Sequence, residues 1–183
     1  MSTRICPWWL TYTFDNPLRR LLHDPAKIVG PYVRPGMRVA DIGCGMGYFT
    51  LTLAALVGPN GHVQAVDLQT QQLARVRARC EQAGVADRVE LTQAKPDALG
   101  LKPGLDFVLA FWMVHEVPDA ERFFTEIKVN LAPGGAMLIA EPKMHVSAES
   151  FAAMVGTCGR LGFNTTPVDS VRISRAVRLS VSP

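Results

Sequence analysis

An acidic strand end that runs into three closely spaced glycines constrains this chain more than any other feature. Residues 39–42 read as a buried strand containing Asp41, and Gly43, Gly45 and Gly47 follow at every second position before a helical pattern over residues 48–54. Glycines let the backbone approach a ligand closely, and a helix N-terminus offers unpaired N–H groups to a carboxylate or a phosphate. The segment therefore predicts a nucleotide-type pocket; the alternative is an ordinary αβ turn whose glycines serve packing.

The glycine spacing indicates which kind of ligand this pocket binds. A dinucleotide-binding turn has the spacing G-x-G-x-x-G. Here the third glycine, Gly47, comes one position early, and Tyr48 stands where that fingerprint has Gly or Ala. The spacing, together with the absence of a Tyr-x-x-x-Lys pair, argues against a nicotinamide-dependent oxidoreductase.

The length and composition fit one domain with a substantial core. The chain has 183 residues, of which 48% are hydrophobic. The longest apolar run, residues 107–114, is too short to span a membrane, and the N-terminus lacks the plan of a signal peptide. We therefore expect no transmembrane segment.

The cysteines and the charge distribution bound the cellular setting. Cys6, Cys44, Cys80 and Cys158 are widely spaced without a C-x-x-C pair, which argues against a metal site or a disulfide framework and favours a reduced, cytoplasmic protein. The net charges are +4 for residues 1–40, −4 for residues 41–155 and +3 for residues 156–183. The basic ends indicate either solvated faces or attraction of an anionic acceptor or acidic partner, and the lack of long basic runs favours solvated faces.

Strand-like and helix-like segments alternate along the chain, which indicates βαβ units and a mostly parallel sheet. The last two strands are joined by a short connection that allows antiparallel pairing. We expect helices after the glycine-rich turn and over residues 70–83, 119–130 and 148–161. The expected strands are residues 38–42, 62–66, 88–92, 105–112, 136–141, 163–166 and 172–181.

Four segments in this order resemble class I S-adenosylmethionine (SAM)-dependent methyltransferases. They are the glycine motif 41–47, the acidic end of the second strand at 63–68, the fourth-strand region 106–119 and the fifth-strand region 131–142. The similarity covers about residues 30–180 and is greatest to the small-molecule subgroup that includes the quinone-biosynthesis methyltransferases. It implies an α/β, Rossmann-like, seven-stranded and mostly parallel sheet of order 3-2-1-4-5-7-6, with strand 7 antiparallel and helices on both faces.

The resemblance also implies SAM as cofactor, with S-adenosylhomocysteine as product. Asp67 would accept hydrogen bonds from both ribose hydroxyls, or would serve only as an acid at the start of the next helix. Leu68 would pack on the adenine face, or belong to the core. Asp41 would attract the amino group of SAM. The cofactor residues implied at these motifs are Asp41, Gly43, Cys44, Gly45, Gly47, Asp67, Leu68 and Phe111.

Adenine recognition departs from the family pattern after the third strand. Many members place Asp where this chain has Lys95, and a lysine cannot accept a proton from the adenine amino group. Two alternatives remain. Asp97 takes the role after a small loop shift, or backbone groups around Lys95 and Pro96 do.

Methyl transfer is an in-line displacement, so the enzyme mainly positions the nucleophile and removes its proton. His115, just after the fourth strand, is the predicted general base; its alternative role is to order the loop through a backbone hydrogen bond. Glu116 is a second candidate base, or simply begins the next helix. The segment lacks the Asn/Asp-Pro-Pro-aromatic motif of amino-methylating nucleic-acid enzymes, so we expect no nucleic-acid substrate.

The predicted domains are an N-terminal cap segment, residues 1–30, and a single SAM-binding domain, residues 31–183. Trp8, Trp9 and Tyr12 are candidates for binding the substrate; the alternatives are contact with a membrane surface and packing on the sheet edge. With no sizeable insertion between strands, the acceptor site would be open or would be completed by a second subunit in a homodimer.

The sequence thus predicts a SAM-dependent methyltransferase that acts on O, N or C of a small organic acceptor. The alternative from another class is a non-catalytic SAM-binding regulatory or partner subunit. Retention of the glycines and of Asp67 argues against that alternative.

Overall fold

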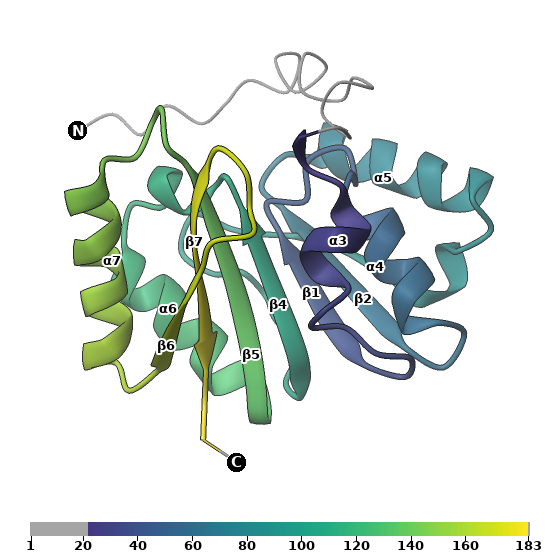
Figure 1. Ribbon diagram of the computed structural model, residues 1–183. Helices are drawn as coiled ribbons and strands as arrows, with labels where there is room; N and C mark the ends of the chain where they lie inside the picture. Colours follow the sequence, from purple (N-terminus) through teal and green to yellow (C-terminus); the bar gives the residue numbers. More distant parts are fainter. Residues whose placement is uncertain (1–21, 183) are drawn as a thin grey trace.

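Seven strands form one mixed sheet in the computed structural model, which describes residues 22–182 (Figure 1). The order is β3-β2-β1-β4-β5-β7-β6; β1 to β5 are parallel, and β7 runs antiparallel to both of its neighbours. The predicted fold class is therefore confirmed. The strands are β1 (Arg38–Ile42), β2 (His62–Asp67), β3 (Val89–Gln93), β4 (Leu105–Phe111), β5 (Leu131–Pro142), β6 (Asn164–Val168) and β7 (Ser174–Ser180).

Helices cover both faces of this sheet because neighbouring strand residues point to opposite sides. Val39 and Phe107 pack in the core cluster that contains α3 and α4, whereas Ala40 and Val108 pack with α6 and α7. A smaller cluster holds α5 against β2 through Ala65. The helices are α3 (Pro25–Val29), α4 (Thr50–Val57), α5 (Thr70–Gln82), α6 (Ala120–Asn130) and α7 (Ala148–Arg160), with 3-10 turns η1 (Ala86–Arg88) and η2 (Val114–Glu116).

Local chemistry explains where several of these elements begin. Asp119 caps α6 by accepting from the Arg122 N–H at 3.0 Å, as its sequence position predicts. The first helix after the glycine motif begins at Thr50 rather than at Tyr48, because the turn that contains Gly47, with φ of +82°, continues through Phe49. The loop is therefore longer than the sequence indicates.

The start of β5 also differs from the expectation. The sequence predicts a strand over residues 136–141, yet the strand begins at Leu131 and its pairing with β4 shifts register between Leu105 and Phe107. The Pro-Gly-Gly segment therefore produces an irregularity within the strand instead of preceding it.

The carboxyl ends of β1, β2, β4 and β5 lie at one edge of the sheet, and β7 enters at the same edge because Ser174 pairs with Pro142. The strand order reverses between β1 and β4, which is the usual position of a ligand site in such sheets. Within the predicted cap, α3 contributes Ile28 and Val29 to the core, while residues 1–21 lie outside the described part. Among residues 22–182, no helix has the length and apolarity that a membrane span requires.

Candidate functional site

The glycine loop is fastened to the end of β2. The N–H groups of Gly43 and Cys44 both donate to the Val66 carbonyl, at 2.8 and 3.1 Å, and the Gly45 N–H donates to Oδ2 of Asp67 at 2.9 Å. The two predicted halves of the cofactor site, the loop after β1 and the acid after β2, are thus in direct contact.

These bonds change which donors the loop has left for a ligand. The Gly47 N–H donates to the Cys44 carbonyl at 2.9 Å, so the N–H groups of all three motif glycines and of Cys44 already have acceptors within the protein. Further N–H donors lie at the N-terminus of α4, where the N-cap residue Phe49 makes no side-chain capping bond. The start of α4 is therefore a place where a ligand carboxylate could find N–H donors besides those of the glycines.

Asp41 is buried, with 2% of its surface exposed, and its Oδ2 accepts from the Thr50 hydroxyl at 2.6 Å. Since Thr50 is the first residue of α4, this bond ties the end of β1 to the helix that follows the loop. Asp41 therefore fixes the loop's shape; its attraction for a ligand amino group stays a prediction.

Asp67 is held in one orientation by backbone donors on both sides. Besides the Gly45 contact, its Oδ1 accepts from the Gln69 N–H at 2.9 Å. Burial raises the pKa of this carboxyl, and the N–H groups of Gln69, Gly45 and Leu68 oppose that shift. An ionised carboxylate has about four acceptor positions. Both oxygens therefore retain capacity for further donors, and the acid also supports the start of α5.

Leu68 follows directly and has 38% of its surface exposed. The interpretation of Leu68 as a core residue is therefore wrong. An exposed apolar side chain next to a fixed carboxylate suits a flat ligand with a polar edge.

The loop after β3 is a tight, braced turn. The Lys95 N–H donates to the Ala98 carbonyl at 2.8 Å and the reverse bond measures 3.2 Å, which puts Pro96 and Asp97 at the tip. Arg122 donates to the Pro96 carbonyl at 2.9 Å. Lys95, Pro96 and Asp97 are all exposed. A shift of this loop would break these three hydrogen bonds. The structure therefore favours the alternative in which adenine is recognised without a loop shift.

The end of β4 carries a strained aromatic residue. Trp112 has φ of +60°, a conformation that bulky residues rarely adopt. Its N–H donates to the Ala140 carbonyl at 2.7 Å and its Nε1 to Oγ of Ser174 at 2.9 Å, so β5 and β7 together hold it. Phe111, a predicted cofactor residue, is only 7% exposed and packs on Phe49 at a ring distance of 4.6 Å.

Close packing joins this strand end to the glycine loop. A Cβ atom at Gly43 would lie 2.8 Å from Cγ of Met113, and Gly43 has φ of +67°. At Gly45 an added Cβ would meet no atom within 4 Å. Glycine is required at the first position by both conformation and space, while the second faces open space that a ligand can occupy.

His115 pairs with a carboxylate that the sequence analysis gave no role. Nδ1 of His115 lies 2.5 Å from Oε2 of Glu141, and Oε1 of Glu141 accepts from the Val114 N–H at 2.9 Å. Glu141, at the end of β5, is only 1% exposed, whereas the His115 side chain is 26% exposed. The hydrogen bond to Glu141 raises the pKa of His115 and outweighs the effect of burial. The sequence does hold a signal for Glu141, because it is an acidic residue at the end of an otherwise apolar strand.

Two exposed apolar residues lie on loops at the same edge. Met144, after β5, is 81% exposed, and Ile173, before β7, is 46% exposed with φ of +52°. The Lys143 N–H donates to the Ile173 carbonyl at 3.1 Å, so these two loops are side by side. The other predicted acceptor residues, Trp8, Trp9 and Tyr12, lie outside the described residues.

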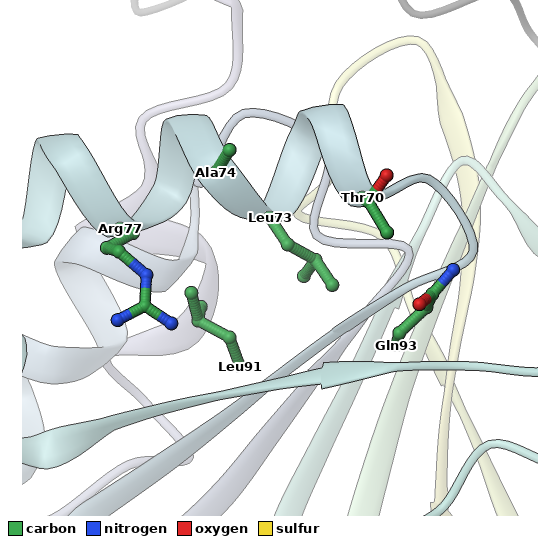
Figure 2. Close-up of a pocket in the computed structure, with 6 residues that line it drawn as sticks. All are labelled: Thr70, Leu73, Ala74, Arg77, Leu91 and Gln93. Atoms are coloured by element: carbon green, nitrogen blue, oxygen red, sulfur yellow. The ribbon is translucent and has the colours of Figure 1, made fainter.

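A separate depression of about 300 Å³ lies between α5 and β3 (Figure 2). It is lined by Thr70, Leu73, Ala74, Arg77, Leu91 and Gln93. Gln93 Nε2 donates to the Leu68 carbonyl at 3.4 Å, so the Gln93 end of the depression adjoins the loop after β2. The depression borders the candidate site but contains neither Asp67 nor the glycine loop.

Two sequence relatives are named as a carboxy-S-adenosyl-L-methionine synthase and a C-methyltransferase. A carboxy-S-adenosyl-L-methionine synthase of Dichelobacter nodosus is 33% identical over 122 residues, which are 66% of this chain and 51% of the relative. A ubiquinone/menaquinone biosynthesis C-methyltransferase of Ectopseudomonas mendocina is 34% identical over 110 residues, 60% of this chain and 43% of the relative. The predicted similarity to quinone-biosynthesis enzymes is confirmed, although the chain spans about half or less of these relatives' length.

Solved structures share the fold. A SAM-dependent methyltransferase from Aquifex aeolicus superposes with a TM-score of 0.86 and 22% identity, covering 97% of this chain and 100% of that one. A family model described as a methyltransferase domain matches residues 39–135, from β1 to the irregular start of β5 and more than half of the 183 residues. The chain therefore belongs to the methyltransferase-domain family, as the glycine motif and the end of β2 predicted.

Proposed function

We propose that this protein is a SAM-dependent methyltransferase that transfers a methyl group to a small organic acceptor. The observation that carries the proposal is the contact of the Gly45 N–H with Asp67, which joins the loop after β1 to the acid after β2 where the strand order reverses. Membership of the methyltransferase-domain family supports it.

The residues at this edge fit SAM. Asp67 retains acceptor capacity for the two ribose hydroxyls, and the exposed Leu68 offers an apolar surface to the adenine ring. Gly45 borders open space, and the N-terminus of α4 offers donors to the carboxylate. When bound, SAM supplies a methyl group on a positively charged sulfur that is already reactive.

In this proposal, further cofactor contacts come from the turn after β3 and from the loop itself. The turn of Lys95, Pro96 and Asp97 faces the adenine edge, and its braced geometry favours backbone carbonyl acceptors or Asp97 without a loop shift. Gly43, Cys44 and Gly47 shape the loop and Asp41 anchors it. Phe111 supports the site from beneath, since it is almost fully buried.

The acceptor end of the site lies at the loops after β4 and β5. His115 is the proposed general base, and Glu116 on the same turn is the second candidate. Met144 and Ile173 form an exposed apolar rim on which an apolar part of the acceptor can rest. A homodimer that completes this side, and a cytoplasmic location, remain part of the proposal; the buried, unpaired thiols of Cys44, Cys80 and Cys158 fit a reducing compartment.

The first test is a calorimetric titration of the purified protein with SAM, S-adenosylhomocysteine and NAD in parallel. Micromolar affinity for both adenosyl ligands and none for NAD is the expected result. Incubation with methyl-labelled SAM and a panel of small hydroxyl, amine and carbon acceptors then tests transfer. Binding of NAD alone would overturn the proposal, and SAM binding without transfer to any acceptor would favour a non-catalytic subunit.

A further inference from the structure

We propose that Glu141 is a positioning residue that holds His115 in the tautomer whose Nε2 accepts the acceptor's proton. This inference rests on the proposed function and assigns a role to a side chain that the family similarity did not single out. It also defines the acceptor chemically, as a group with a proton to lose when it is methylated.

The geometry fixes which ring nitrogen carries the proton. Both oxygens of Glu141 are in use: Oε1 accepts from the Val114 N–H at 2.9 Å and Oε2 lies 2.5 Å from Nδ1 of His115. An ionised carboxylate can only accept hydrogen bonds, so Nδ1 must be the donor. In the neutral imidazole the proton is then on Nδ1, and Nε2 is left as an acceptor.

The burial of the two groups suits this division of roles. Glu141 is 1% exposed at the end of β5, so its orientation is set by packing and by the Val114 bond. The His115 side chain retains 26% exposure, which is what a group needs in order to meet a substrate. His115 follows β4 and Glu141 ends β5, two neighbouring strands whose carboxyl ends meet at the same edge.

Three titratable groups face His115 within residues 22–182. Glu141 lies on β5, Glu116 lies on the same 3-10 turn, and the ring of His145, from the loop after β5, is 6.0 Å away and edge-on. The two carboxylates both raise the pKa of His115, with the Glu141 hydrogen bond as the largest cause. The base is therefore stronger than an ordinary histidine, and it loses its proton at a higher pH.

The step balances as follows. The acceptor's X–H bond breaks and its proton moves to Nε2 of His115. The electron pair left on the acceptor atom forms the new bond to the methyl carbon, while the former methyl–sulfur pair stays on sulfur. The positive charge that leaves the sulfur appears on the imidazolium, where Glu141 stabilises it.

The test is histidine ring ¹⁵N NMR over a pH series, which reports the tautomer and titration of His115 without any acceptor. Neutral His115 should show a protonated Nδ1 and a bare Nε2. In Glu141→Gln, the amide oxygen would accept from the Val114 N–H, so the amide NH₂ group would face Nδ1 of His115. Nδ1 should then lose its proton to Nε2, and the titration of His115 should move to lower pH. Glu90→Gln is the matched control, because Glu90 pairs with His62 at 3.2 Å beyond this site.

Wild-type protein with the proton on Nε2 would overturn the proposal, and so would a Glu141→Gln variant with unchanged tautomer and titration. If that variant does not fold, the wild-type spectrum alone decides. Affinity for S-adenosylhomocysteine, measured on the same samples, should change less than about twofold, whereas turnover of an identified acceptor should fall by about 10²-fold or more. Absence of S-adenosylhomocysteine binding would refute the proposed function and leave the tautomer result intact.

Discussion

Replacing Asp67 by Asn is the sharpest test of the proposed cofactor site. The wild-type carboxylate accepts from the Gly45 and Gln69 N–H groups, each at 2.9 Å. An amide has one acceptor oxygen, so one of these N–H groups would lose its partner and face an NH₂ group. A hydrogen bond to a charged group contributes about 1.5–3 kcal/mol, and we expect the free energy of unfolding to fall by about that amount.

The same reasoning sets the loss of affinity. One ribose hydroxyl loses its acceptor, and about 1.5–3 kcal/mol corresponds to a rise in Kd of about 10- to 150-fold. Calorimetry with S-adenosylhomocysteine is the appropriate assay, because this ligand lacks the sulfonium charge and reports on hydrogen bonds rather than on long-range attraction. Glu90→Gln, the same chemical change on the neighbouring strand, should leave Kd unaltered. A folded Asp67→Asn protein with Kd within about threefold of wild type would refute the ribose assignment.

Three further changes test the surrounding site. Gly43→Ala and Gly84→Ala both impose a left-handed φ on alanine, at about 1–2 kcal/mol, but only at Gly43 would the new Cβ lie 2.8 Å from a methionine side chain. Thermal unfolding should therefore show a larger loss of stability for Gly43→Ala, and only that variant should weaken S-adenosylhomocysteine binding. Leu68→Ser should raise the Kd of S-adenosylhomocysteine about three- to tenfold, whereas Val129→Ser, at another exposed apolar position, should leave it unchanged. Equal effects of the two changes would refute the contact of Leu68 with adenine. His115 has a raised folded-state pKa, so its ion pair stabilises fully below its ordinary value of 6.5 and progressively less as pH rises through the folded value. The difference in unfolding free energy between wild type and His115→Gln, from urea denaturation at several pH values, should shrink in that direction, and a constant difference would contradict it.

The sequence predicted the elements of this fold because their signals are local. Apolar runs bounded by glycine and proline mark the strands, and Asp119 marks the start of α6 through a bond to a residue three positions away. Strand order came from the family resemblance, since no local signal specifies which strands lie side by side, whereas the short connection between the last two strands already allowed the antiparallel pairing of β6 and β7. The predicted boundaries differ from the structure at Thr50, where the turn after β1 continues through Phe49, and at Leu131, where the pairing of β5 with β4 shifts register.

Motif spacing by itself determined the glycine loop and argued against a dinucleotide ligand, because the motif consists of residues close together in the chain, while SAM and the role of the acid after β2 followed from the family resemblance. Only the tertiary structure decided how they act. It showed that the loop N–H groups are already bonded, that Leu68 is exposed, and that Glu141 meets His115 across 26 positions of sequence. Such contacts arise from the parallel alignment of β4 and β5, which brings the ends of separate strands together and which residue spacing along the chain does not encode.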